Sequence, residues 1–295
     1  MSKNNYNWAL VLSGGGARGF AHIGFLKEMT AAGYPKPSLV VGTSMGAIVG
    51  GLFACGMPAT EMERFLLSEF KMSDYLDSFA FRLNGPVGQI VQTGQMLANL
   101  ATKTGVDRGQ KALDLFNTLT GGKKFDETEI PFMCNAVDLV EGREVVFSSG
   151  SVAKAMRASM SFPVFFEPLI EGEMCLVDGG IFDNLPVGIA RKEGFNRIMA
   201  VDVNRFTDRS TDDLKNGPQI IYRSMECVLR YMQSNRQEQA ELTINISDDA
   251  TPLSFYRKKE FIKLGEQAVK SNPSALENFF NPRFGSSRAP VVCGI

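Results

Sequence analysis

Several features that would assign a chain to a class at once are missing from these 295 residues. The five cysteines are scattered, odd in number and never spaced as C-x-x-C, which argues against a disulfide framework and against a zinc site. No run of about 18 apolar residues is present that could span a bilayer. The first residues lack the apolar segment and cleavage site of a secretory signal, so we expect a cytoplasmic protein with reduced thiols.

An excess of charge of either sign is also missing. The chain has 31 lysine and arginine residues against 32 acidic residues, a formal net charge of -1. This balance gives no general attraction to nucleic acid, and we expect no nucleic-acid partner. Hydrophobic residues make up 44% of the sequence, so a chain of this length can bury one core of useful size. We expect a single domain over residues 1–295.

Short apolar segments alternate with helical patterns along the chain. The run at 8–12 ends at a glycine cluster, and apolar residues then recur at helical spacing over 20–29. A second apolar run at 38–42 precedes small residues that suit a closely packed helix. Further strands are expected at 132–137, 144–147, 173–177, 197–203 and 242–246, and further helices at 219–240 and 255–270. The alternation predicts an α/β fold of three layers with a mostly parallel central sheet.

Residues 71–109 interrupt this alternation. Phenylalanine, leucine, valine, isoleucine and methionine are mixed there with glycines and polar residues, without a regular period. We interpret this stretch as a cap or lid over the sheet.

The sharpest local signal is G-x-S-x-G at residues 42–46, placed after a strand and before a helix. This is the setting of a nucleophile elbow, with Ser44 at its tip. Gly42 and Gly46 suit a sharp turn in which a Cβ atom would obstruct close approaches. Taken alone the motif is a weak signal, because glycine-rich turns that contain serine are common.

A serine nucleophile needs a base, and the usual one is histidine. The chain has a single histidine, His22, in the first turns of an expected helix, where a packing or helix-surface role is the simpler interpretation. Asp178 is the better candidate, because it follows an apolar strand and precedes Gly179 and Gly180, which let neighbouring backbone pass close. An ordinary Asp-Gly turn would have the same sequence, and the presence of Ser44 favours the catalytic interpretation.

A third motif, Ser13 to Gly19, follows the first strand and satisfies G-x-G-x-x-G, so it admits dinucleotide binding. The next strand, however, ends without the acidic residue that would hold a ribose, and no Gly-Lys-Ser/Thr of a P-loop follows. The amides of Gly14, Gly15 and Gly16 at a helix N-terminus suit an oxyanion hole instead. Arg18 either adds positive charge there or serves as a solvated loop residue or a structural ion pair.

Together these motifs resemble the patatin-like phospholipases. Residues 14–19 match the oxyanion loop of that family, 42–46 the elbow and 178–180 its D-G-A/G motif, in the family's order. Residues 158–166 look like its A-S-x-x-x-P-x-x-F segment, and 264–268 are similar to a closing element of bacterial members. The resemblance covers about residues 8–203, the expected core of the domain, with the cap at about 71–109.

Two positions depart from the family pattern. Ser13 stands where plant patatins carry aspartate, and Gly180 stands where many members have alanine. Neither change removes a reacting group, so they bear on substrate range more than on mechanism.

The resemblance implies a three-layer α/β/α patatin-like fold and a Ser-Asp dyad, with Ser44 as nucleophile and Asp178 as proton acceptor. It implies hydrolysis of carboxylic esters of phospholipids, lysophospholipids or neutral lipids through an acyl-enzyme, without metal or other cofactor. Two alternatives stay open: transfer of the acyl group to an alcohol, and a lipid-binding regulatory module with weak catalysis. The apolar residues of 71–109 suit either transient contact with the inner face of a membrane or a buried cap core.

Overall fold

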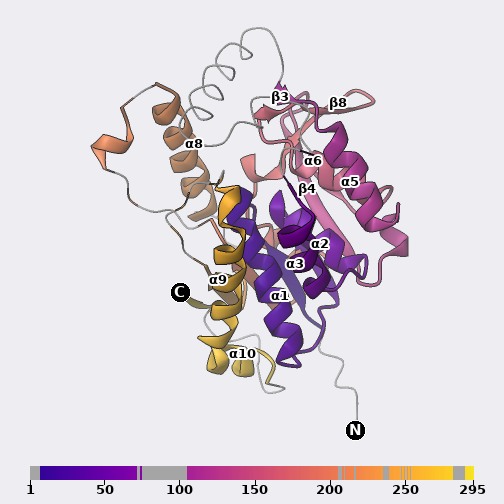
Figure 1. Ribbon diagram of the computed structural model, residues 1–295, viewed down its shortest axis with the longest axis vertical. Coiled ribbons are helices and arrows are strands. Elements are labelled where there is room, and N and C mark those ends of the chain that lie inside the picture. The colour runs from indigo at the N-terminus through magenta and orange to yellow at the C-terminus, as the bar shows by residue number, and fades with distance from the viewer. Residues whose placement is uncertain are drawn as a thin grey trace.

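The structure is a computed structural model (Figure 1). It describes residues 7–71, 74, 105–204, 208, 210–215, 217–234, 239–246, 248, 250, 252, 254–281 and 290–295. The cap expected at 71–109 therefore lies outside the described residues, apart from Lys71, Asp74 and residues 105–109.

Nine strands of the described residues form one sheet, in the order β11-β10-β9-β1-β2-β4-β8-β7, with β5 also paired to β4. The strands from β11 to β4 run parallel, whereas β5, β7 and β8 are antiparallel to their neighbours. Their bounds are Ala9–Leu12 (β1), Leu39–Gly42 (β2), Phe132–Asp138 (β4), Arg143–Phe147 (β5), Leu169–Glu171 (β7), Met174–Asp178 (β8), Ile198–Asp202 (β9), Leu242–Asn245 (β10) and Val291–Gly294 (β11). A separate parallel pair joins β3 (Gly105–Asp107) to β6 (Val164–Phe166). The predicted α/β fold with a mostly parallel sheet is confirmed.

Helices follow most of the strands. The α-helices of the described residues are α1 (Ala21–Ala31), α2 (Met45–Ala54), α3 (Ala59–Ser68), α5 (Gln110–Thr120), α6 (Val152–Ser159), α7 (Val187–Lys192), α8 (Gly217–Ser234), α9 (Lys258–Lys270) and α10 (Pro273–Phe279). Two short 3-10 helices, η1 (Gly16–Phe20) and η5 (Gly179–Ile181), follow β1 and β8. Within this described part of the chain, no helix is long and apolar enough to cross a membrane.

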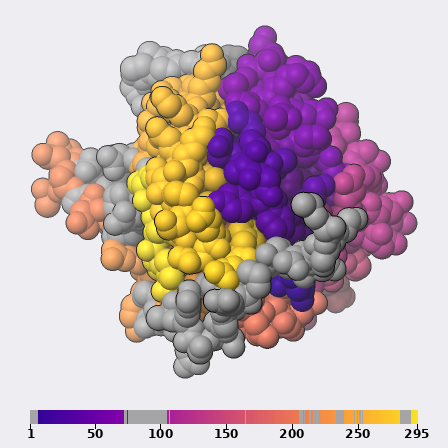
Figure 2. All heavy atoms as spheres, turned by 90° about the horizontal axis from the view of Figure 1, so that it is seen from below, coloured from indigo at the N-terminus to yellow at the C-terminus, as the bar shows by residue number. Residues whose placement is uncertain are grey.

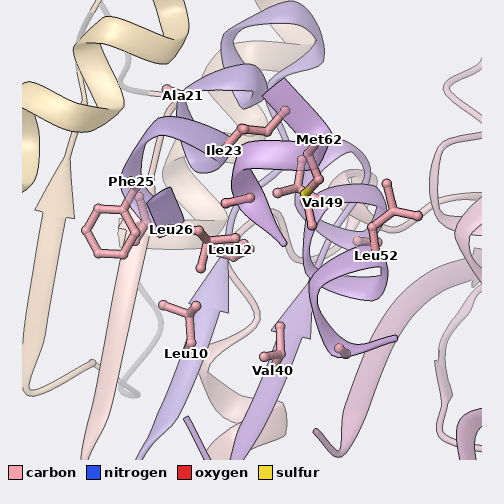
Figure 3. Packing of buried hydrophobic residues seen from close by; sticks show 14 of the residues in the cluster. Leu10, Leu12, Ala21, Ile23, Phe25, Leu26, Val40, Val49, Leu52 and Met62 are labelled. Carbon is pink, nitrogen blue, oxygen red and sulfur yellow. The ribbon is translucent and has the colours of Figure 1, made fainter. Parts of the chain in front are cut away.

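Side chains of β1 and β2 alternate between two buried layers, as residues of a central strand should. Leu10, Leu12 and Val40 enter the larger cluster, which α1, α2, α3 and α9 complete (Figures 1 and 3). Val11 and Val41 face the opposite way, into a smaller cluster with α7. Helices therefore cover both faces of the sheet, as the three-layer prediction requires.

Helices α1 and α9 lie backbone against backbone, although they come from opposite ends of the chain (Figures 1 and 2). A Cβ atom added to Gly24 would lie 1.8 Å from the carbonyl oxygen of Ile262, and one added to Gly265 would lie 1.9 Å from that of Ala21. Only glycine allows so close a crossing. Helix α1 continues directly from η1, and α9 packs against both of them. Helix α9 therefore stabilises the glycine-rich loop, which leads into η1.

Candidate active site

The glycine-rich loop after β1 lies at a topological switch point of the sheet. Strand β1 pairs with β2 on one side and with β9 on the other. The chain passes from β1 to β2 and returns to β9 only much later, so the loops after β1 and β9 diverge. Ligands of α/β proteins bind at the carboxyl edge of the sheet at such a point.

Ser44 follows β2 in a strained backbone conformation. Its φ of 54° and ψ of -120° make it the only non-glycine residue with a positive φ in the described part of the chain. A Cβ atom on Gly42 would lie 2.4 Å from the carbonyl oxygen of Gly46, and one on Gly46 would lie 2.3 Å from that of Leu12. The strand, sharp turn and helix of an elbow are therefore present.

Asp178 ends β8 with its carboxylate directed at the elbow. The carboxylate accepts the backbone N–H of Gly180 at 2.7 Å, and the Ser44 side chain lies close enough to act on its pKa. Burial raises the pKa of Asp178 to about 6, against the opposing effect of Ser44 and of the Gly180 N–H. At neutral pH the carboxylate is mostly ionised, yet more basic than an exposed one, as suits a proton acceptor.

The sheet register explains how residues far apart in the chain meet. Both β2 and β8 pair with β4, with Gly42 opposite Cys134 and Asp178 opposite Ala136. Ser44 lies two residues beyond Gly42, as Ala136 lies two beyond Cys134. Ser44 and Asp178 therefore lie at the same level along the sheet, at the carboxyl edge of the parallel strands.

His22 packs in the interior, on α1. Its side chain is fully buried and its Nε2 lies 2.9 Å from the carbonyl oxygen of Ser13. Burial lowers the pKa of His22 to about 4, so the ring is neutral at physiological pH and Nε2–H donates to that oxygen. Its Nδ1 has no hydrogen-bond partner among the described residues. The packing interpretation of His22 fits this arrangement, and the helix-surface one does not.

The glycine-rich loop lies against the elbow. A Cβ atom on Gly14 would be 3.0 Å from the Cβ of Ser44. The backbone N–H of Gly14 donates to the carbonyl oxygen of Asn184 at 3.2 Å, whereas those of Gly15 and Gly16 have no acceptor among the described residues. Gly16 has a φ of 57° and begins η1. Two amides without an acceptor among the described residues thus lie at the start of η1, directly after Gly14, which packs against Ser44.

Arg18 is buried, and its guanidinium is directed at the end of β9. Its Nε donates to the carbonyl oxygen of Gly15 at 3.4 Å, and its terminal nitrogen donates to the Asn204 side chain. Arg18 also lowers the pKa of Asp202, which burial raises overall. These contacts indicate that Arg18 stabilises the conformation of the glycine-rich loop.

Ser13 joins the loop to the same end of β9. Its hydroxyl accepts the backbone N–H of Val203 at 2.9 Å and lies close enough to the Asp202 carboxylate to lower its pKa, which burial raises. At the other end of the loop, a Cβ atom on Gly19 would lie 2.3 Å from the Cγ of Met45. The loop is thus fixed between β9 and the start of α2.

A buried polar network beneath the elbow connects it to the turn after β8. The Thr43 hydroxyl lies 2.8 Å from Oδ1 of Asn135 and 3.0 Å from the carbonyl oxygen of Asp183. The Asn135 amide donates to that same carbonyl at 3.0 Å. A Cβ atom on Gly179 would lie 2.3 Å from Oδ1 of Asn135, so glycine there admits the network.

Our sequence analysis missed three residues that contact the site. Asn135 belongs to the network above, the Ser159 hydroxyl accepts the backbone N–H of Ser44 at 2.9 Å, and the Asn184 side chain lies beside Gly14. A Cβ atom on Gly180 would be 2.9 Å from Oδ1 of Asn184. They share no single sequence signal: Asn135 lies inside strand β4, Ser159 ends helix α6 within the 158–166 segment noted above, and Asn184 follows the turn after β8.

A family model described as patatin-like phospholipase matches residues 10–191. The chain belongs to the patatin-like phospholipase family, a class of carboxylic ester hydrolases. It is 32% identical over 196 residues to an uncharacterized NTE family protein of Mycobacterium tuberculosis, in a match covering 66% of this chain and 30% of that protein. It is 28% identical over 277 residues to the lysophospholipase NTE1 of Eremothecium gossypii, covering 87% of this chain and 17% of the fungal protein. The chain thus spans only a minor part of these relatives.

Two solved structures have a similar course of the chain. VipD from Legionella pneumophila superposes with a TM-score of 0.46 and 16% identity, over 90% of this chain and 67% of VipD. The type III effector ExoU superposes with a TM-score of 0.43 and 17% identity, over 91% of this chain and 53% of ExoU.

Proposed function

We propose that this chain hydrolyses carboxylic ester bonds of lipids, with Ser44 as nucleophile and Asp178 as base. One observation carries the proposal: at a strained elbow, the Ser44 side chain lies close enough to the buried Asp178 carboxylate to lower its pKa. Strain of this kind persists where the surrounding structure enforces it, and it concentrates at functional sites.

In the proposed reaction, Asp178 accepts the proton of the Ser44 hydroxyl as its oxygen bonds to the ester carbonyl carbon. The N–H groups of Gly15 and Gly16 donate to the oxyanion that forms, while the N–H of Gly14 is already engaged with Asn184. The protonated Asp178 then gives its proton to the departing alcohol, and an acyl-enzyme remains. A water molecule then gives a proton to Asp178 as its oxygen bonds to the acyl carbon, and Asp178 returns that proton to the Ser44 oxygen as the bond to the acyl group breaks and the fatty acid leaves.

We propose lysophospholipids as the first substrates to test, because fungal relatives are named lysophospholipases. The proposal includes transient contact with a lipid surface. Helix α8 supports it with Ile221, Val228 and Tyr231, which are 73%, 56% and 71% exposed on one side of the helix. Sedimentation with phospholipid vesicles, comparing the protein with a variant that has serine at these three positions, tests the contact.

The reaction is tested with Ser44→Ala and Asp178→Asn on a p-nitrophenyl ester and on lysophosphatidylcholine. Each change removes a reacting group, so turnover should fall roughly a thousandfold or more while circular dichroism stays unchanged. A fluorophosphonate probe should label the unchanged protein and leave Ser44→Ala unlabelled. Full activity in either variant would end the proposal, and product analysis with added glycerol separates hydrolysis from acyl transfer.

His22→Gln is the matched control for the choice of base. The glutamine amide can still donate to the carbonyl oxygen of Ser13, as Nε2–H of His22 does. If Asp178 is the base, this variant should keep its activity within about tenfold, because its effect is limited to support of the loop. An inactive His22→Gln together with an active Asp178→Asn would transfer the role of base to the histidine.

A further inference from the structure

The C-terminal turn of α6 contacts the backbone of both proposed reacting residues. The Ser159 hydroxyl accepts the backbone N–H of Ser44 at 2.9 Å. Two residues later, the carbonyl oxygen of Ser161 accepts the backbone N–H of Asp178 at 3.0 Å. One short segment therefore holds the ends of β2 and β8, on which the approach of the two side chains depends.

The hydrogen bond from Ser44 to Ser159 compensates for the unusual backbone of the elbow. At a positive φ the N–H of Ser44 leaves the hydrogen-bonding pattern of β2, and a buried N–H needs another acceptor. Ser159 is 0% exposed, so its hydroxyl supplies that acceptor where bulk water cannot. A strained conformation persists only where its surroundings fix it, and this contact acts on the strained residue itself.

The position of this turn is itself fixed by a buried guanidinium. Arg157 donates to the Ser161 hydroxyl, to the carbonyl oxygen of Gly109 at 3.1 Å and to that of Glu167 at 2.9 Å. The Ser161 hydroxyl in turn donates to the carbonyl oxygen of Arg157 at 2.8 Å. The end of α6 is therefore bound to residues that follow β3 and β6 as well as to the site, and it cannot shift without breaking several hydrogen bonds.

We propose that Ser159 is a positioning residue for the nucleophile: it binds the elbow backbone to the same turn that holds Asp178 and so sets the approach of the Ser44 hydroxyl to the carboxylate. This inference rests on the proposed function of Ser44 and Asp178. In this role Ser159 acts through the backbone N–H of Ser44, to which its hydroxyl is hydrogen-bonded. Its loss should therefore impair the chemical step and leave substrate binding unchanged.

The test is Ser159→Ala, which removes one buried oxygen atom. We expect kcat on a p-nitrophenyl ester to fall about 10- to 100-fold, because small displacements of a nucleophile are costly, with KM changed less than about twofold. The acid limb of the pH profile should move to higher pH, because the Ser44 side chain lowers the pKa of Asp178. Ser159→Thr, which keeps the hydroxyl, should recover part of the lost kcat.

Ser151→Ala is the matched control. Ser151 is the N-cap of the same helix, and its hydroxyl also accepts a backbone N–H, that of Lys154 at 3.3 Å. This variant should lower the melting temperature of the protein and leave kcat, KM and the pH profile unchanged. All proteins are assayed well below their melting temperatures, so that a loss of stability does not register as a loss of kcat.

Two results would overturn the inference: kcat of Ser159→Ala within twofold of the unchanged protein, or an equal fall of kcat in Ser151→Ala. Failure of the proposed function gives a different result, since Ser44→Ala would then remain active. An inactive Ser44→Ala with a fully active Ser159→Ala would refute the role of Ser159 alone.

Discussion

The elbow at Ser44 and the glycine-rich loop after β1 lie side by side but are fixed by different kinds of interaction. Hydrogen bonds between uncharged groups of Ser159, Thr43 and Asn135 hold the elbow, and the Asn135 amide also donates to the Glu144 carboxylate at 2.9 Å. The loop is held by charged groups, with Arg18 beside the Asp202 carboxylate, and by backbone contacts to later parts of the chain. The proposed nucleophile thus depends on neighbours within residues 43–183, and the proposed oxyanion hole depends on residues up to 265.

The difference has an energetic basis. Neutral hydrogen bonds in a dry interior are insensitive to salt and to moderate pH, and each one lost leaves a buried polar group unsatisfied. A charged contact responds to the titration of its groups, and a buried one such as that of Arg18 with Asp202 is screened little by salt. Substitutions in the elbow and in the glycine-rich loop should therefore differ in the size of their effects and in how these effects depend on pH.

Apart from changes to Ser44 and Asp178 themselves, the largest effect is expected on the loop side, from Gly16→Ala. A Cβ atom there would lie 2.4 Å from the carbonyl oxygen of Pro252, and the φ of 57° adds strain, so the loop must move. Displacing an oxyanion donor should lower kcat about 100- to 1000-fold. Gly172→Ala is the control, because Gly172 has a φ of 61° in a turn with no atom within 4 Å of the added Cβ. Normal turnover in Gly16→Ala would remove the loop from the mechanism.

An intermediate effect is expected from Arg18→Gln and from Asn204→Ala, each about tenfold in kcat. If Arg18 acts by holding the loop through Asn204, the double variant should be hardly worse than either single one, because both changes break one contact. A double variant whose losses multiply would indicate that Arg18 acts on the oxyanion directly. Steady-state kinetics of the four proteins decide between these outcomes.

On the elbow side, the pH profile reports the state of Asp178. Because burial raises its pKa to about 6, kcat/KM should fall about tenfold per pH unit below pH 6 and be level above it. An acid limb near pH 4 would mean that the carboxylate is solvated in the working protein.

The smallest effect is on the stability of Asp178→Asn. This change should abolish activity but raise the free energy of unfolding. The folded protein holds the Asp178 proton more tightly than the unfolded chain does, so ionisation between about pH 4 and pH 6 lowers the free energy of unfolding. Asparagine cannot ionise. Asp178→Asn should therefore be more stable than the unchanged protein at pH 8, by on the order of 1 to 3 kcal/mol, with the gap closing near pH 4. Urea unfolding at the two pH values measures it.

The sequence predicted the parts of this molecule that depend on local pattern. The apolar runs at 8–12, 38–42, 132–137 and 242–246 correspond to β1, β2, β4 and β10 with small changes of boundary. Strands β3, β6 and β7 have three residues each, too few to give a period, and they were missed. Ser44, Asp178 and the loop glycines were predicted as site residues because each lies at or just after the end of a strand, at a glycine-marked turn, and their roles stay predictions.

Contacts across the fold could not be predicted in the same way. The bonds from Ser159 to Ser44 and from Arg18 to Asn204 join residues with no fixed spacing in the chain. They depend on sheet order, with β9 beside β1 and β8 beside β4, which strand patterns alone do not determine. The sequence therefore could not decide whether Arg18 adds positive charge at the oxyanion hole or makes a structural contact.

The crossing of α1 and α9 at Gly24 and Gly265 bears on how small a working fragment can be. The family match ends at residue 191, yet a protein truncated there would lose the helix that covers the α1 backbone around Ala21 and Phe25. Water would then reach the rear of η1, whose amides begin the proposed oxyanion hole. The shortest fragment that keeps a rigid loop therefore extends through Lys270, about 80 residues beyond the recognised motifs.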